Sequence, residues 1–103
     1  MKATDASAVS VSGTVFYWRG PAPFHFVRVP DDDVAFIKGL AAMFSYGWGM
    51  IPVTARLGST RFTTSLFPKA GGYLVPLKDA VRSAENVDLD DQVTIIVELR
   101  RRK

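Results

Sequence analysis

The residues best suited to chemistry lie in or beside one polar, alternating segment near the middle of the chain. Between positions 45 and 67 the sequence combines cations, hydroxyls and aromatic rings, which are the groups that bind an anionic or aromatic ligand or form a protein hot spot. The candidate ligand-binding set comprises Arg56, Arg61, Thr63, Ser65, Trp48 and Tyr46. The simpler alternative is that Trp48 closes a hydrophobic core, while the arginines are solvated strand residues.

The two arginines carry the ligand hypothesis. A turn at Gly58 and Ser59 would bring their strands together, and two cations held close repel each other unless an anion or a carboxylate lies between them. No aspartate or glutamate occurs between Asp33 and Asp79, so an internal partner must come from distant sequence. An external anion would serve equally well.

Catalytic groups are scarce. The chain has one histidine, His25, and no cysteine, which excludes thiol catalysis, disulfides and multi-histidine metal sites. Within "FHFV" His25 reads as an ordinary strand residue. The acidic triplet at 31–33 fans out over a first helical turn and does not converge on a metal. The segment "SLFPKAGG" lacks the Gly-Lys-Ser/Thr ending of a phosphate loop. We therefore expect no catalytic residue, no metal and no cofactor.

Length and composition indicate one folded domain. The 103 residues are 48% hydrophobic, enough for a packed interior. The net charge is +3, but removing the terminal "RRRK" leaves −1, so the basic balance is weak evidence for a nucleic-acid partner. No apolar run approaches a signal peptide or a membrane span, and we expect a cytoplasmic protein with no membrane association.

Hydrophobic periodicity predicts a mainly β fold. Strands are expected at 9–18, 24–29, 50–57, 60–67, 73–75 and 92–99, helices at 31–44 and 76–84, and a loop at 68–72. This order favours a small, mostly antiparallel β-barrel capped by two short helices, spanning 9–99 between a flexible N-terminus (1–8) and a basic tail (100–103). Phe16 and Trp18 lie on the face opposite Val11 and Val15, so the first strand is partly buried on both sides.

The middle hairpin has a definite register. Ile51, Val53, Ala55 and Leu57 point one way and Arg56 the other; on the returning strand Phe62, Thr64 and Leu66 oppose Arg61, Thr63 and Ser65. In the last strand Ile96 faces away from its inward neighbours. This predicts that another element or a partner chain covers Ile96, as in a homodimer.

Three segments together resemble a known family. "GPAPFHFVRVP", "GWGMIPVTARLGSTRFTTSLFPKAGGYLVPLKDAVR" and "VDLDDQVTIIVEL" are similar to the bacterial domain-of-unknown-function family DUF1905 over 9–99. The resemblance implies a double-split β-barrel, a pseudobarrel with helical caps, and no established activity. Related sequences commonly have Gly-Asp before the last strand where this chain has Asp90-Asp91; because aspartate tolerates left-handed backbone, we expect the turn to persist.

The double-split class also includes AbrB-like transcription factors, whose strand–helix–strand segment resembles "LVPLKDAVRSAENVDLDDQVTIIVEL". Here that stretch carries Lys78 and Arg82 against six acidic residues, five of which precede the last strand, and this argues against DNA on that face. The leading hypothesis is a non-enzymatic binding or interaction module for a small anionic ligand or a protein partner. The alternatives are an enzyme of unknown reaction, using Arg56, Arg61 and Trp48, and an AbrB-like nucleic-acid binder.

Overall fold

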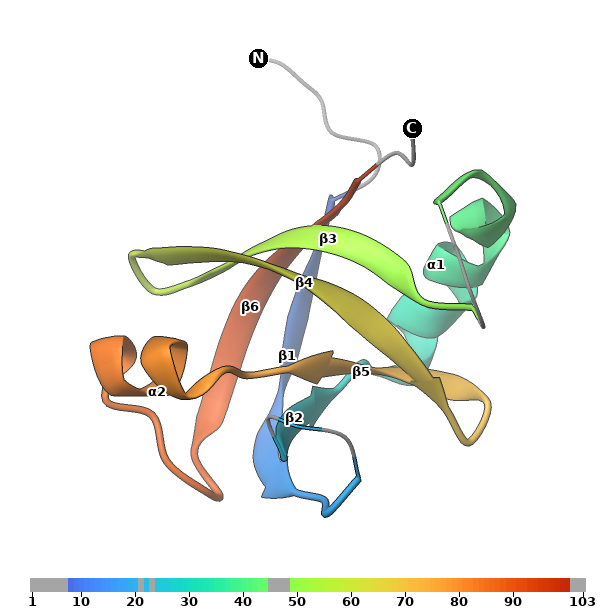
Figure 1. Ribbon diagram of the computed structural model, residues 1–103. Helices are drawn as coiled ribbons and strands as arrows, with labels where there is room; N and C mark the ends of the chain where they lie inside the picture. The colour runs from blue at the N-terminus through green and yellow to red at the C-terminus, as the bar shows by residue number, and fades with distance from the viewer. Residues whose placement is uncertain (1–7, 21, 23, 45–48, 101–103) are drawn as a thin grey trace.

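The chain folds into a closed antiparallel barrel of six strands in the order β1-β2-β5-β4-β3-β6 (Figure 1). The computed structural model describes residues 8–20, 22, 24–44 and 49–100, with the backbone alone for 40–44. The elements are β1 (Ala8–Tyr17), β2 (His25–Arg28), α1 (Asp31–Phe44), β3 (Ile51–Leu57), β4 (Thr60–Lys69), β5 (Gly72–Pro76), α2 (Asp79–Glu85) and β6 (Gln92–Leu99). The predicted barrel and order of elements are confirmed.

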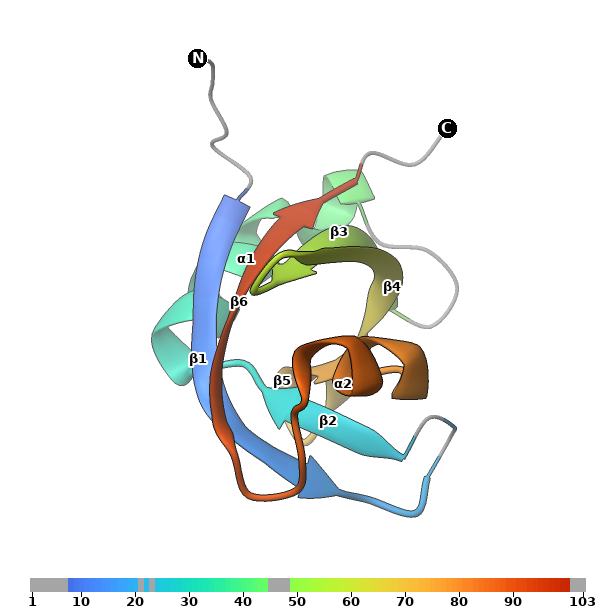
Figure 2. The ribbon, with the colours of Figure 1, turned by 90° about the vertical axis from the view of Figure 1, so that its left-hand side faces the viewer.

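Two long strands join the halves of the barrel. The first part of β1 pairs with β6 and its last three residues pair with β2, and Figure 2 shows β1 and β6 side by side along one wall. In the same way, β4 pairs with β3 up to Leu66 and with β5 from Phe67 onward. A ten-residue strand that pairs on both sides of a barrel must bend, so β4 presents its outward residues to two different surfaces.

The barrel interior follows the predicted alternation. Every second residue of β3 is buried, and so is every second residue of β6, which places Val53, Ala55, Ile95 and Val97 in one hydrophobic core. Tyr73 of β5 belongs to this core, and burial raises the pKa of its phenol. The helices lie at opposite ends, α1 against β3 and β5, and α2 against β4 (Figure 1).

Two local predictions were wrong. The loop expected at 68–72 is a two-residue turn, because β4 continues to Lys69, which pairs with Gly72. Ala70 and Gly71 have φ of 53° and 80°, the two positive values that a tight type I′ hairpin turn requires. The second helix begins at Asp79 rather than 76, because Pro76 still pairs with Phe26 in the sheet.

The turn at Asp90 and Asp91 keeps its shape with aspartate. Asp90 has φ 72°, and its N–H donates to the Val15 carbonyl at 2.9 Å. The Asp91 carboxylate accepts from the Asp88 N–H at 2.8 Å, and the Asp91 carbonyl accepts from the Val15 N–H at 2.9 Å. These bonds attach the turn to β1. Within the described ranges, no helix has the length and apolar character needed to cross a bilayer.

Candidate functional site

Arg56 and Arg61 lie directly opposite each other across the β3–β4 hairpin. The turn between their strands is held from both sides. Gly58 adopts φ 61°, and its carbonyl accepts a hydrogen bond from Arg56 Nη1 at 3.0 Å. From α2, the Glu85 carboxylate accepts from the Thr60 hydroxyl at 2.5 Å and from the Ser59 hydroxyl at 3.4 Å. The arginine pair therefore sits at the anchored end of the hairpin.

Strand register places the arginines on a four-strand outer face. Ser10, Ile96, Arg56 and Arg61 form one row across β1, β6, β3 and β4, and the next row is Ala8, Glu98, Thr54 and Thr63. Directly paired residues project from the same face of a sheet. This face is therefore polar apart from Ala8 and Ile96, and Ile96 is 37% exposed. Among the described residues no element buries Ile96, and its covering by a partner chain stays a prediction.

A shallow depression of about 220 Å³ opens on this face. We call it the basic depression; it is lined by Thr54, Ala55, Arg56, Arg61, Ile96 and Glu98. Glu98 comes from distant sequence, as any internal partner of the arginines would have to. Among the residues that the structure describes, it forms no ion pair with either arginine. The two ion pairs found in that part of the chain both involve Arg82.

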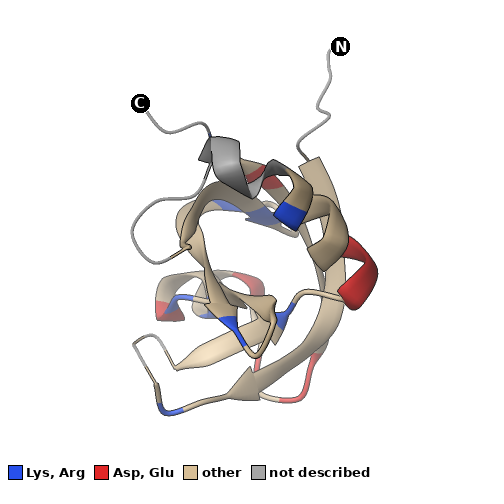
Figure 3. Ribbon diagram, turned by 90° about the vertical axis from the view of Figure 1, so that its right-hand side faces the viewer, with Lys and Arg blue, Asp and Glu red and all other residues tan. Residues whose placement is uncertain are grey.

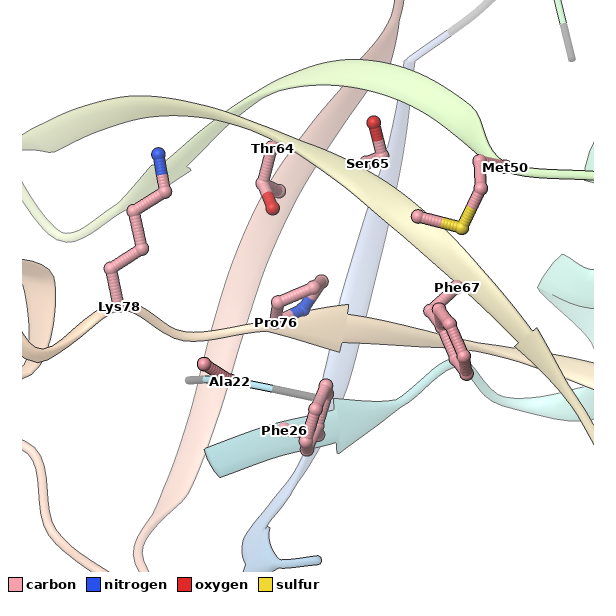
Figure 4. A pocket seen from close by; sticks show the side chains of 8 residues that line it. All are labelled: Ala22, Phe26, Met50, Thr64, Ser65, Phe67, Pro76 and Lys78. Carbon is pink, nitrogen blue, oxygen red and sulfur yellow. The ribbon is translucent and has the colours of Figure 1, made fainter. Parts of the chain in front are cut away.

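A second depression lies further along β4, where this strand joins β5 (Figure 4). We call it the apolar pocket; it measures about 280 Å³ and is lined by Ala22, Phe26, Met50, Thr64, Ser65, Phe67, Pro76 and Lys78. Of these eight residues only Ser65 belonged to the candidate set, so the sequence reasoning missed the two phenylalanines, Met50 and Lys78. Its walls come mainly from β2, β4 and β5, and β2 is adjacent to β5 in the barrel although the two strands are separated in sequence.

Aromatic packing on the outside of the barrel supports the apolar pocket. Phe26 lies between Phe16 of β1 and Pro76 of β5 in one row of paired residues. Trp18 packs against Phe26 and Phe67 with ring centroids 5.5 and 5.7 Å away, and Lys69 Nζ lies 4.2 Å from the centre of its ring. The sequence did give a signal for this packing. Alternation placed Phe16 and Trp18 on the face of the first strand opposite Val11 and Val15, which implied burial on both faces of β1.

The structure divides the candidate residues between the two depressions. Arg56 and Arg61 line the basic depression, with Thr63 in the adjacent row, whereas Ser65 borders the apolar pocket. Tyr46 and Trp48 lie outside the described residues. His25 lines neither depression; its ring lies edge-on to Tyr17 at 5.6 Å, and its Nδ1 has no hydrogen-bond partner in the described part of the chain.

Charge on the described residues is dispersed. Figure 3 shows lysines and arginines on several elements, while acidic residues gather at the start of α1 and at the turn before β6. Over the same residues, no three histidine, aspartate or glutamate side chains come close enough to hold a metal ion. The basic depression is thus a local concentration of positive charge rather than part of a broad basic surface.

Comparison with known families identifies one family model that matches the chain. The family model described as "Domain of unknown function (DUF1905)" matches residues 12–97. Because this match covers most of the chain, the protein belongs to the DUF1905 family. A search of curated proteins finds no match.

Proposed function

We propose that this DUF1905 domain is a non-enzymatic binding module for a small oxyanion, held between Arg56 and Arg61. The observation that supports the proposal is the register that sets the two arginines opposite each other. Like charges directly opposite on neighbouring strands destabilise a sheet, so an unneutralised pair is an unfavourable arrangement for a purely structural surface. An anion between the guanidinium groups removes that repulsion.

The donor geometry suits carboxylate, sulfate or phosphate. A guanidinium presents several N–H groups in one plane and binds such oxyanions through paired hydrogen bonds. Arg56 uses one terminal nitrogen on the Gly58 carbonyl, which holds the side chain near the turn and leaves its other donors for a ligand. Among the described residues, Arg61 has no hydrogen-bond or ion-pair partner. The Thr54 hydroxyl is available at the edge of the same depression.

Glu98 limits how strongly an anion can bind. Its carboxylate lines the depression together with the two arginines, which leaves a formal charge of +1 there. The depression is also open to solvent, so screening by salt weakens its electrostatic attraction. We expect modest affinity that falls as ionic strength rises, and tighter binding when the Glu98 charge is removed.

Thermal unfolding with added sulfate, phosphate or acetate tests the proposal at constant ionic strength. A ligand present at about 100 times its Kd stabilises the folded state by about 2.7 kcal/mol, which corresponds to a rise in Tm on the order of 10 °C for a domain of this size. The variant with Arg56→Ala and Arg61→Ala should lose this rise, while Glu98→Gln should increase it at a given ligand concentration.

Lys38→Ala is the matched control, because it removes an exposed positive charge from α1. It should behave as the unmodified protein does. Equal Tm shifts in the double arginine variant and the unmodified protein would refute the proposed site and leave the arginines as solvated surface residues.

A further inference from the structure

We infer that the apolar pocket is a second binding site, which takes a small organic monocarboxylate with an apolar body. Its carboxylate would meet the ammonium of Lys78, and its ring or short chain would lie beside Phe26 and Phe67. This inference does not depend on the arginine pair, because the two depressions share no lining residue.

The apolar end of the pocket is formed by packed side chains. Figure 4 shows Met50, Phe67 and Phe26 around one end of the space. Trp18 contacts both phenylalanine rings, so they are supported from another element and cannot readily collapse into the space between them. A cavity with such walls favours an aromatic or branched aliphatic group over water.

The polar end contains one cation with a defined position. Lys78 lies just before α2 in extended backbone, and its Nζ donates to the Thr63 carbonyl at 2.8 Å. An ammonium has three N–H donors, so this bond positions the group beside β4 and leaves two donors for a ligand. Figure 4 shows the Thr64 hydroxyl on the same side of the pocket, pointing toward Pro76.

No carboxylate neutralises this ammonium within the described residues. The pocket lining contains no acidic side chain. Asp79, the next residue in the chain, instead pairs with Arg82 at 3.2 Å. The other nearby lysine, Lys69, lies over the Trp18 ring. Charge complementarity therefore favours a ligand with one anionic group, placed at the Lys78 end of the pocket.

Size and polarity together define the ligand class. At about 280 Å³ the pocket is at the small end of ligand sites, which are typically ~300–1,000 Å³. This volume suits a single ring or a short branched chain. A fully hydrated ion such as phosphate would lose its water against the apolar wall without compensation, and a neutral apolar molecule would leave the ammonium unmatched. An amphipathic monocarboxylate satisfies both ends.

Titration followed by amide chemical shifts in NMR tests the site, with phenylacetate as the probe. Acetate supplies the carboxylate without the ring, and phenylacetamide supplies the ring without the charge. We expect phenylacetate to shift the amides of Phe26, Phe67 and Lys78 in a saturable manner, with a Kd about tenfold or more below that of either comparator. Equal affinity for phenylacetamide would overturn the role of Lys78. Shifts confined to the outer face that contains the basic depression would overturn the location of the binding site.

Substitutions separate this site from the arginine pair. Lys78→Met keeps the apolar stem and should weaken phenylacetate binding about tenfold, since it removes a charge-assisted contact. Thr64→Val should weaken it less, and Lys38→Met should leave it unchanged. The variant with Arg56→Ala and Arg61→Ala should bind phenylacetate at Phe26 and Phe67 as before. Unaltered binding to Lys78→Met, or loss of binding in the double arginine variant, would refute the inference.

Discussion

The basic depression and the apolar pocket lie along the same strand, yet they are built in opposite ways. In the basic depression, exposed side chains project from a continuous sheet face, and Ile96 is 37% exposed among them. In the apolar pocket, the walls are also part of the protein's packing, and Phe26 is only 1% exposed. Apart from Ala55, which belongs to the core, the residues of the first can be replaced without disturbing the core, whereas Phe26 of the second is itself part of the packing.

The bend of β4 explains the difference. Up to Leu66 the outward side of this strand belongs to the sheet with β3, β6 and β1, and beyond it to the sheet with β5 and β2. The first surface carries Ser, Thr and Arg at outward positions, while the second carries aromatic residues. A polar outward surface gives electrostatic recognition that salt weakens, and an apolar one gives a preformed cavity.

The largest expected effect is a difference in the free energy of unfolding that is lost when one apolar side chain is truncated in each region. Phe26→Ala should lower the free energy of unfolding by about 3–5 kcal/mol, because it removes a fully buried ring from between Phe16, Trp18 and Pro76. Ile96→Ala, on the outer face of the basic depression, should cost less than about 1 kcal/mol. Urea denaturation of both variants measures the contrast. A cost for Ile96→Ala as large as that for Phe26→Ala would mean that Ile96 is covered in solution, as a dimer would require.

A smaller loss of stability is expected from a substitution in the turn that joins the two arginine-bearing strands. Gly58→Ala should destabilise the fold by about 2 kcal/mol, because φ 61° is unfavourable for alanine and its Cβ would collide with the Glu85 carboxylate. Chemical denaturation measures the loss. Ser59→Ala, the neighbouring control, removes only the long hydrogen bond to Glu85 and should cost far less.

The same Gly58→Ala variant sharpens the comparison of the two depressions. Displacement of the turn should weaken anion binding at the arginines while leaving the apolar pocket intact, because the aromatic wall of that pocket lies on β2 and on the part of β4 that pairs with β5. Parallel loss of sulfate and phenylacetate binding in a variant that is still folded would show that the two sites are coupled.

The smallest effect is a gain in stability. Arg61→Gln should raise the free energy of unfolding by a few tenths of a kcal/mol at low salt, because it relieves repulsion between charges directly opposite on paired strands. The gain should vanish near 1 M NaCl, where exposed charges are screened. Arg61→Lys keeps the charge and should show no gain. Salt-dependent urea titrations provide the measurement, and a loss of stability in Arg61→Gln at low salt would indicate that Arg61 has a favourable partner.

Much of the fold was predictable because its signals are local. Alternation in β3 and β4 predicted which side chains face inward, and the two-residue turn at Gly58 and Ser59 determined the pairing of Arg56 with Arg61. The start of α2 was missed for a tertiary reason, whereas the 68–72 turn was missed because composition does not reveal the tight turn at Ala70 and Gly71. Pairing of Pro76 with Phe26, and of Lys69 with Gly72, extends the strands into segments whose composition indicates a helix start and a loop.

By itself, the sequence determined the barrel, its hydrophobic interior and the arginine pair, since periodicity and turn chemistry act over a few neighbouring residues. Closure of the barrel alone decided which distant residues meet. It brought Glu98 of β6 into the basic depression, and it placed Lys78 with Phe26 and Phe67 around one cavity. Those residues come from separate elements, and only the strand order and the bend of β4 set them side by side.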